Sequence, residues 1–237
     1  MLAQWMKESK RTVIFSGAGM STESGLPDFR SALQGIWKGK DPALFASTHA
    51  LRHNRQAFVE FYRMRIEGLQ QCRPHIGHHI LAKWEKQGHL HAVITQNVDG
   101  FHQEAGSQNV AELHGTLATV HCQTCLRDYP SAKYLEQDGT VCECGGFLRP
   151  SVVLFGETLP EKALATAEEE MLLAEVCIVL GSSLQVSPAN WYPRMAKENG
   201  AKLVIVNMEP TELDDLADLV ISDQKIGTFL QNLDVQL

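Results

Sequence analysis

The sequence predicts an α/β fold in which a parallel sheet is covered by helices on both faces. Runs of β-branched and aliphatic residues recur along the chain, stay apolar over their whole length, and alternate with segments of helical spacing. Strands that are buried on both faces show such continuous runs, whereas a half-solvated sheet shows alternation. Glycine or polar residues follow where these runs end, and ligands of open α/β sheets bind beyond the carboxyl ends of the strands.

Five apolar runs are expected to form strands, at residues 12–16, 92–95, 176–180, 203–206 and 219–221. Each is a short run bounded by turn residues, as buried strands are. The first four stop at Gly17, Gln96, Gly181 and Asn207. We therefore expect a ligand site where these four residues meet at one edge of the sheet.

Helices are predicted where apolar residues return every three or four positions, at 54–71, 75–87, 161–175 and 225–237. In the third segment Leu164, Ala167 and Met171 fall on one stripe, and the glutamates face away from it. Such a stripe is typical of a helix that packs against a sheet with one face.

Length and charge restrict the class of protein. With 237 residues the chain can form one large domain, and its net charge of −7 argues against nucleic acid as the main partner. It holds no apolar run of the ~20 residues that span a bilayer. Residues 1–11 lack the apolar core of a secretory signal. We expect a cytoplasmic protein that binds neither nucleic acid nor membrane.

Four of the six cysteines gather between residues 122 and 144, which predicts a metal site rather than a disulfide framework. Cys122-x₂-Cys125 is followed after 16 residues by Cys142-x-Cys144. Thiolates suit Zn²⁺, and four of them fill its coordination shell, so one structural zinc ion is predicted. His121 is an alternative ligand.

The turn Gly17-Ala18-Gly19 follows the first predicted strand. Glycines at this place let the backbone approach a pyrophosphate, and the nearby amides can donate to it. The turn is not a full G-x-G-x-x-G motif, because Thr22 stands at the last glycine position. A purely structural glycine turn fits these residues equally well.

The residues that continue this turn resemble the signature of the sirtuin family. Residues 21–30 read STESGLPDFR, and the family's segment ends in G-I-P-D-F-R, so Leu26 is the departure. Further blocks similar to the family follow in family order at 95–106, 114–115, 149–157 and 181–189. The resemblance covers residues 11 to about 210 and implies an NAD-dependent protein-lysine deacylase, most readily a deacetylase of the bacterial type.

The resemblance also implies the organisation of the chain. A large Rossmann-like part would consist of residues 1–30, 88–118 and 150–237. A small module would consist of the helical residues 31–87 and the zinc-binding residues 119–149. NAD would lie in the cleft between the two parts. The Cys-x-Cys pair departs from the family's two Cys-x-x-Cys pairs, because Val141 stands where the third cysteine usually falls.

The resemblance implies His114, Asn97 and Asp99 as catalytic residues. His114 would deprotonate a ribose hydroxyl, a task that suits imidazole because its pKa lies near the working pH. Asn97 would orient ribose and water, and Asp99 would bind the nicotinamide carboxamide. Judged without the resemblance, His114 is as readily a turn residue, and amide or carboxylate side chains after a strand can be simple turn formers.

NAD contacts are implied in three blocks of the sequence. Phe29 would cover the reacting ribose, and Arg30 would contact the phosphates or hold the loop. A contact to adenine is expected near 224–226, with its register open. The full set is Gly17, Ala18, Gly19, Ser21, Thr22, Glu23, Asp28, Phe29, Arg30, Gln96, Asn97, Val98, Asp99, His114, Gly181, Ser182, Ser183, Asn207, Met208 and Glu209.

The acylated protein substrate is expected to bind as an extended segment that adds a strand between residues 153–157 and 186–189. The residues implied there are Val153, Phe155, Gly156, Glu157 and Val186.

Tyr62 and Arg65 match the spacing of family members that act on succinyl or malonyl lysine, where a guanidinium binds the distal carboxylate. The alternative is a helix with one buried face and a solvated arginine. Additional desuccinylase or demalonylase activity is therefore a hypothesis.

Three rival functions remain open at this point. An ADP-ribosyltransferase or NAD hydrolase would keep the cofactor residues without a working acyl tunnel. A zinc-ribbon binding module would need a basic surface, which this acidic chain does not indicate. A non-catalytic NAD sensor would not need His114. Against these, the favoured reaction removes the acyl group and gives nicotinamide and O-acyl-ADP-ribose.

Overall fold

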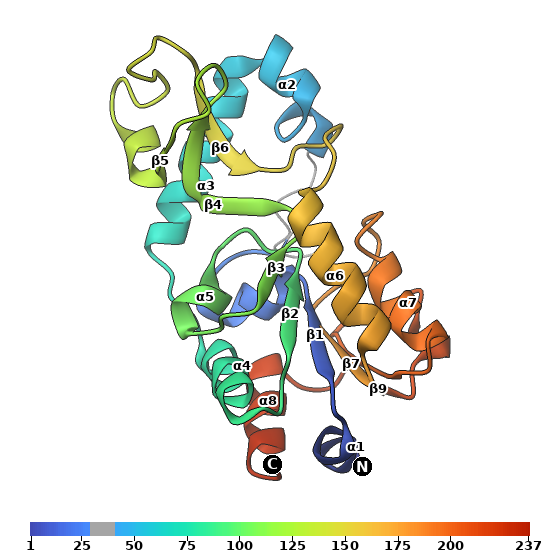
Figure 1. The fold of residues 1–237 in the computed structure, drawn as a ribbon. Helices are drawn as coiled ribbons and strands as arrows, with labels where there is room; N and C mark the ends of the chain where they lie inside the picture. The colour runs from blue at the N-terminus through green and yellow to red at the C-terminus, as the bar shows by residue number, and fades with distance from the viewer. Residues whose placement is uncertain (29–40) are drawn as a thin grey trace.

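The computed structural model describes residues 1–28 and 41–237, so Phe29 and Arg30 lie outside the described residues. Figure 1 shows a larger part built around one sheet and a smaller module at one end of it. Among the helices in the described ranges, none has the length and apolar character that crossing a membrane requires.

The larger part is a six-stranded sheet in which all neighbours are parallel. Its order is β3-β2-β1-β7-β8-β9. Three strands run outward from β1 on one side and three from β7 on the other, which is the doubly wound Rossmann order. The predicted fold class is confirmed. The strands are β1 (Thr12–Ser16), β2 (Ala92–Thr95), β3 (Val110–Glu112), β7 (Val176–Leu180), β8 (Lys202–Val206) and β9 (Leu219–Ile221).

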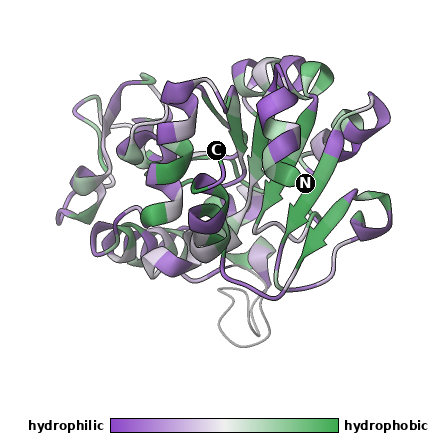
Figure 2. Ribbon diagram, turned by 90° about the horizontal axis from the view of Figure 1, so that it is seen from below, coloured by the Kyte–Doolittle hydropathy of each residue, from purple (hydrophilic) through white to green (hydrophobic). Residues whose placement is uncertain are grey.

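Helices cover both faces of this sheet. Successive side chains of a strand point to opposite faces, so Ile14 packs in one core while Val13 and Phe15 pack in the other. The first core includes α1 (Leu2–Glu8), α4 (Ile76–Gln87) and α8 (Ile226–Asp234), and the second includes α6 (Glu161–Leu173) and α7 (Trp191–Glu198). Figure 2 shows the hydrophobic strands flanked by helices with hydrophilic outer parts.

The small module has a separate core. Its sheet is antiparallel in the order β5-β4-β6, from β4 (Gly115–Cys122), β5 (Asp128–Pro130) and β6 (Leu148–Val152). The helix α3 (Arg55–Gln70) packs Phe58, Tyr62 and Ile66 into that core beside α2 (Thr48–His53). Shorter helical segments are α5 (Phe101–Ala105), η1 (Ala18–Ser24), η2 (Pro42–Leu44), η3 (Ser131–Leu135) and η4 (Asp214–Leu216).

The helix α4 packs with the large part rather than with the module. Ile80, Leu81 and Trp84 belong to the same core as α8, and Trp84 Nε1 donates to Asp234 Oδ1 at 2.8 Å. The resemblance to the sirtuins implies that all of 31–87 belongs to the module. We propose that the large part instead begins again at α4. We also propose that the module takes in all of β4 and β6 and continues to residue 157, because the buried apolar residues of this stretch up to 154 pack in the module's core.

Two glycine turns meet where the strand order reverses, between β1 and β7. Gly17 N donates to Leu180 O at 3.0 Å, and Gly19 N donates to Gly181 O at 2.8 Å. A Cβ on Gly17 would lie 2.7 Å from Gly181 O, and a Cβ on Gly19 would lie 2.7 Å from the Cα of Gly181. Gly181 itself has a φ of +62°. The glycines are required because the two backbones touch directly.

We predict that Gly19→Ala lowers the free energy of unfolding by about 1–3 kcal/mol, the usual cost of overpacking. The measurement is urea denaturation at 25 °C. Gly68→Ala is the matched control, because nothing lies within 4 Å of a Cβ there. Its unfolding free energy should stay level or rise by up to about 1 kcal/mol, since alanine suits a helix better than glycine. An unchanged stability in Gly19→Ala would contradict the close contact of the two turns.

Candidate active site

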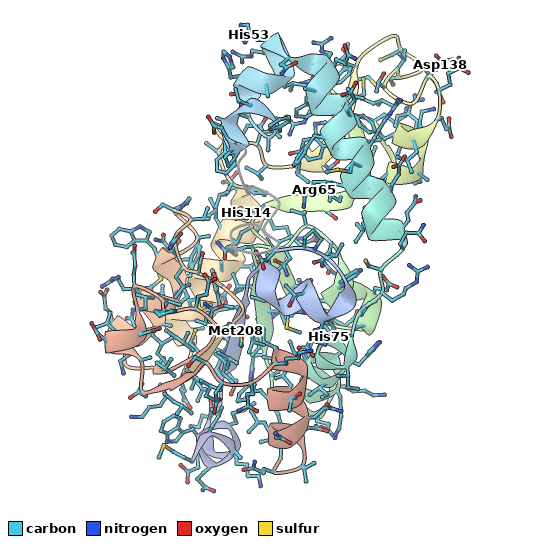
Figure 3. All side chains as sticks on the ribbon, turned by 180° about the vertical axis from the view of Figure 1, so that it is seen from behind. His53, Arg65, His75, His114, Asp138 and Met208 are labelled. Atoms are coloured by element: carbon cyan, nitrogen blue, oxygen red, sulfur yellow. The ribbon has the colours of Figure 1, made fainter. Side chains whose placement is uncertain are left out.

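A cleft of about 640 Å³ lies beyond the carboxyl ends of the strands, between the sheet and the small module. We call it the main cleft. A smaller hollow of about 250 Å³, the side pocket, adjoins it and shares Ala18, Arg65, Asn97 and Val98 with it. All the predicted catalytic, NAD-binding and substrate-binding residues within 1–28 and 41–237 line the main cleft except Ser21 and Asp99, which line the side pocket. Figure 3 shows Arg65 and His114 near each other where the two parts join.

The segment η1 forms the first wall of the main cleft. Gly17, Ala18, Gly19, Thr22, Glu23 and Asp28 line it. Thr22 Oγ1 donates to Gly19 O at 2.9 Å and so closes the turn. Glu23 Oε1 accepts from Gly227 N at 2.7 Å, in the first turn of α8. A carboxylate is stabilised at a helix N-terminus, so Glu23 ties the turn to α8.

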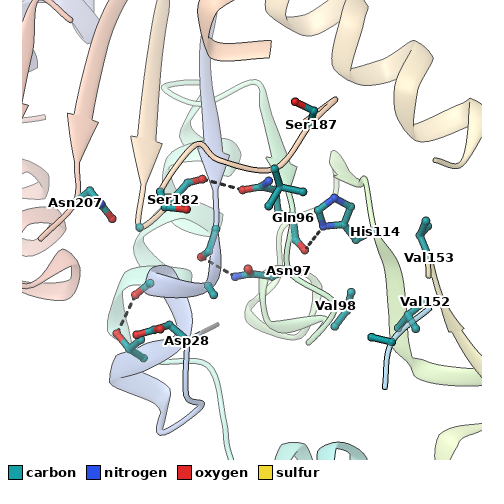
Figure 4. Close-up of a pocket in the computed structure, with 18 of the residues that line it drawn as sticks. Asp28, Gln96, Asn97, Val98, His114, Val152, Val153, Ser182, Ser187 and Asn207 are labelled. Carbon is teal, nitrogen blue, oxygen red and sulfur yellow. Dashed lines mark hydrogen bonds between the residues drawn. The ribbon is translucent and has the colours of Figure 1, made fainter. Parts of the chain in front are cut away.

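Gln96 and Asn97 connect the ends of three strands. Ser182 Oγ, after β7, donates to Gln96 Oε1 at 2.8 Å. Asn97 Nδ2, after β2, donates to Gly17 O at 3.0 Å and to Ser21 Oγ at 3.2 Å. Figure 4 shows the bond between Ser182 and Gln96 and the bond from Asn97 to the turn after β1. Both amide side chains are therefore held in fixed orientations by the strand ends.

Asp99 is the acid of the side pocket. Its Oδ2 accepts from Ser21 Oγ at 2.7 Å, and its Oδ1 accepts from Phe101 N at 3.0 Å. Burial raises the pKa of Asp99, while these two hydrogen bonds and the charge of Arg65 oppose that rise. The carboxyl group is thus oriented and available to accept a hydrogen bond from a ligand amide.

His114 follows β3 and precedes β4, at the junction of the two parts. Its Nδ1 lies 3.0 Å from Gln96 O. Since a carbonyl can only accept, Nδ1 carries the proton of the neutral ring and Nε2 is its basic nitrogen. Gly115 has a φ of +71°, and a Cβ there would collide with Ser151 O. This close passage of β6 fixes the backbone on which His114 sits.

The far end of the main cleft is lined by the third predicted block. Gly181, Ser182 and Ser183 line it beside Asn207, Met208 and Glu209. Asn207 Nδ2 donates to Glu209 O at 2.7 Å, which orders the segment after β8. Gln224, Lys225 and Ile226 also line the cleft, in the region where the sequence left the register open.

At the end of the main cleft nearest His114, one segment of the small module faces one segment that follows the sheet strand β7. Val153, Phe155, Gly156 and Glu157 line one side, and Val186 with Ser187 and Pro188 lines the other. We call residues 153–157 the peptide segment. Its Val153 N donates to His114 O at 2.8 Å, so the segment starts beside the histidine.

Tyr62 and Arg65 reach the main cleft from α3. Burial raises the pKa of Tyr62 to about 12, so its hydroxyl stays protonated at neutral pH. Burial lowers the pKa of Arg65, whereas Tyr62 and Asp99 act to raise it. The pair supplies a hydroxyl and a guanidinium on the module's side of the cleft.

Four apolar lining residues lie outside the predicted site segments: Ala46, Val152, Leu159 and Val206. Their side chains carry no polar group that could have marked them as site residues. Ala46 reaches the cleft because Phe155 N donates to Ala46 O at 2.9 Å, a long-range contact that the sequence does not signal.

The four clustered cysteines bring their sulfur atoms within 4.8 Å of one another. Cys122 and Cys144 lie 3.5 Å apart at Sγ, and Cys125 and Cys142 lie 3.6 Å apart. Zn–S bonds of about 2.3 Å in a tetrahedron separate the sulfurs by about 3.8 Å, so the cluster fits one structural zinc ion. His121 lies outside the cluster, with Nδ1 at 3.1 Å from Ser151 Oγ.

The Cys-x-Cys pair fits because its turn is tight. Cys142 N donates to Gly146 O and Gly145 N donates to Cys142 O, both at 2.8 Å. A Cβ on Gly146 would lie 2.6 Å from Cys122 Sγ. The turn therefore needs a glycine at this position to bring both sulfurs of the pair inward.

Residues 17–188 match the model of the Sir2 family. The match covers the glycine turns, the histidine and all four cysteines. The chain belongs to the Sir2 family.

Sir2 relatives match the chain over nearly its whole length. It is 60% identical over 236 residues to "NAD-dependent protein deacetylase 1" of Geobacillus kaustophilus, covering 100% of this chain and 97% of the relative. It is 57% identical over 233 residues to the "NAD-dependent protein deacetylase" of Oceanobacillus iheyensis, with 98% of each covered. A solved structure described as "Sir2-p53 peptide-NAD+" superposes with a TM-score of 0.88 at 37% identity, covering 98% of this chain and 95% of that one.

We predict that Cys125→Ser abolishes stoichiometric zinc binding and destabilises the small module, because metal binding and folding of such a module are coupled. The measurement is zinc content by atomic emission on the purified protein, with a thermal melt. Cys72→Ser is the control, since Cys72 lies outside the cluster and should leave both values unchanged. One zinc per chain in Cys125→Ser would show that this sulfur is not a ligand.

Proposed function

We propose that the chain removes acetyl groups from lysine side chains of proteins and consumes NAD in doing so. The products are free lysine, nicotinamide and O-acetyl-ADP-ribose. One observation carries the proposal: His114 lies between two sites. The first, at the strand ends, is suited to a dinucleotide, and the second, at residues 153–157 and 186–188, is suited to an extended peptide. The names of the Geobacillus and Oceanobacillus relatives, which match along their whole lengths, support the same activity.

The lining residues fit NAD. A volume of about 640 Å³ lies in the range of cofactor sites. The glycine turn after β1 leaves room for a pyrophosphate where any side chain would clash, and amides at such a turn donate to phosphate. Ser183 and Asn207 are suited to ribose hydroxyls at the far end. When bound, NAD supplies a ribose carbon from which nicotinamide can depart.

Each catalytic residue has a role that its contacts support. Asp99 accepts a hydrogen bond from the nicotinamide carboxamide in the side pocket. Asn97, held by Gly17 O, orients the ribose. His114 takes a proton from a ribose hydroxyl at Nε2, and Gln96 O keeps Nδ1–H pointing away from the reaction. The carbonyl also stabilises the imidazolium that this proton transfer creates.

The acetylated protein binds as an extended segment between the peptide segment and residues 186–188. Backbone pairing tolerates many sequences, so the site recognises the acyl-lysine more than its neighbours. Val153 and Val186 form the apolar walls along which the acyl-lysine stem reaches His114. A plain NAD hydrolase or ADP-ribosyltransferase binds no acyl-lysine and would not need these apolar walls. The reduced Cys₄ cluster supports a reducing compartment such as the cytoplasm.

We predict that His114→Ala lowers the NAD-dependent deacetylation rate by about 10²- to 10⁴-fold, the usual contribution of a general base. Mass spectrometry of an acetyl-lysine peptide, with and without NAD, measures both the deacetylated peptide and O-acetyl-ADP-ribose. His53→Ala is the control, because this exposed histidine in α2 lies at the outer end of the module.

Three outcomes of this assay would contradict the proposal. A folded, zinc-loaded wild type that leaves the acetyl group in place would refute deacetylation. Loss of NAD without deacetylation would favour the hydrolase or ADP-ribosyltransferase. Full activity in His114→Ala would remove the histidine from the reaction.

Additional activity on succinyl- or malonyl-lysine is a second proposal. It is supported by the presence of Tyr62 and Arg65 on the wall of the main cleft, where a guanidinium could bind a second carboxylate. Charge-assisted hydrogen bonds contribute about 1.5–3 kcal/mol, which corresponds to about 10- to 150-fold in kcat/KM.

We predict that Arg65→Met lowers kcat/KM for a succinyl-lysine peptide by that factor while kcat/KM for the acetyl-lysine peptide falls much less. Steady-state kinetics on the two peptides gives the ratio. Arg52→Met, an exposed position in α2, should leave the ratio unchanged. A wild type inactive on succinyl-lysine, or equal losses on both peptides, would contradict the acyl-selecting role.

A further inference from the structure

Arg149 of β6 is a buried arginine behind the main cleft rather than on its wall. Its side chain is 5% exposed. Its Nη1 donates to Glu157 Oε1 at 2.6 Å and its Nη2 to Glu157 Oε2 at 3.1 Å. The same Nη2 also donates to Val152 O at 2.6 Å, and Nε donates to Pro150 O at 3.3 Å. The guanidinium thus joins the last residues of β6 to the carboxylate at the far end of the peptide segment.

The carboxylate of Glu157 also bonds to the backbone of the peptide segment itself. Its Oε2 also accepts from Leu154 N at 2.8 Å, and its own N–H donates to Leu154 O at 2.9 Å. Gly156 has a φ of +94°, so the chain turns sharply between the two residues. Partial burial would raise the pKa of Glu157, but Arg149 and Leu154 N outweigh it and lower the pKa, which keeps the carboxylate charged.

The rest of the peptide segment is fastened by backbone contacts. Val153 N bonds His114 O at one end. In the middle, Phe155 N donates to Ala46 O at 2.9 Å and Phe155 O accepts from Thr48 N at 3.1 Å. These bonds hold the first three residues, and the charged pair of Arg149 and Glu157 holds the last two.

We propose that Arg149 is a positioning residue of the peptide site: through Glu157 it clamps residues 153–157 in the shape that receives an acyl-lysine peptide. This inference rests on the proposed function and revises one expectation from the sequence. Glu157 lines the cleft as expected, yet its carboxylate shapes the segment instead of contacting the substrate. An ion pair with one buried and one partly exposed partner adds little net stability, so a role in placing the segment accounts for the pair better than stability does.

The test uses Glu157→Gln, Arg149→Met and Arg149→Lys in the full chain. Glu157→Gln keeps the shape of the side chain but loses its charge. The control is Glu170→Gln, which breaks a comparable pair with Arg11 at the distant end of the sheet. Anisotropy of a fluorescein-labelled acetyl-lysine peptide gives its Kd, calorimetry gives the Kd of NAD, and hydrogen–deuterium exchange reports the amides of 153–157.

We expect Glu157→Gln and Arg149→Met to weaken peptide binding about tenfold or more, because a small misplacement of a binding segment is costly. The Kd of NAD should change less than twofold. Exchange in 153–157 should speed up in both variants but not in Glu170→Gln. Arg149→Lys, which keeps the charge but not the paired hydrogen bonds, should recover part of the peptide affinity.

The clamp is overturned if exchange in 153–157 and peptide affinity both stay at wild-type values in Glu157→Gln and Arg149→Met. It is equally overturned if the affinity for NAD falls in parallel with that for the peptide, since that pattern reports general damage. A wild type that binds the peptide but releases no acetyl group would refute the proposed function. If Glu157→Gln and Arg149→Met nevertheless lose peptide affinity as expected, the positioning role of Arg149 would still be supported.

Discussion

The whole site depends on the direct backbone contact between the turns after β1 and β7. Gly17 and Gly181 bring two strand ends so close that no side chain fits between them. Around that contact a continuous chain of hydrogen bonds builds the cleft. Ser182, beside Gly181, fixes Gln96; the carbonyl of Gln96 fixes the ring of His114; and the carbonyl of His114 receives Val153 of the peptide segment. A shift at the glycine turns would therefore reach both the histidine and the peptide segment.

This arrangement divides the work between the two parts of the molecule. The sheet supplies a crevice at the point where its strand order reverses, which is where doubly wound folds bind dinucleotides. The small module supplies the peptide segment and, through α3, the pair Tyr62 and Arg65. A reaction between a dinucleotide and a peptide needs both at once, and His114 lies where the two parts meet. The four-cysteine cluster stabilises the module from its outer end, away from the chemistry.

Much of the sheet and of the cleft could be predicted from sequence, because buried parallel strands appear as apolar runs and glycine or polar turns mark where they end. Five strands and the edge where the ligand residues gather follow from that pattern. The strand β3 did not, because its sequence Val-Ala-Glu ends in a charged residue and is no apolar run. Ala46 and Leu159 could not be foreseen, because apolar lining residues differ from core residues only by position. Glu23 and Glu157 lie at the cleft as expected, but only the coordinates show that their carboxylates bond to the protein's own backbone.

The most direct test of the account is a crystal structure of the chain with a non-cleavable NAD analogue and an acetyl-lysine peptide. We predict that the pyrophosphate lies against Gly17 to Gly19 and that the nicotinamide ribose lies between Asn97 and His114. The acetyl-lysine should enter between residues 153–157 and 186–188. A dinucleotide bound away from the glycine turns, or a peptide that leaves its acetyl group remote from His114, would contradict it.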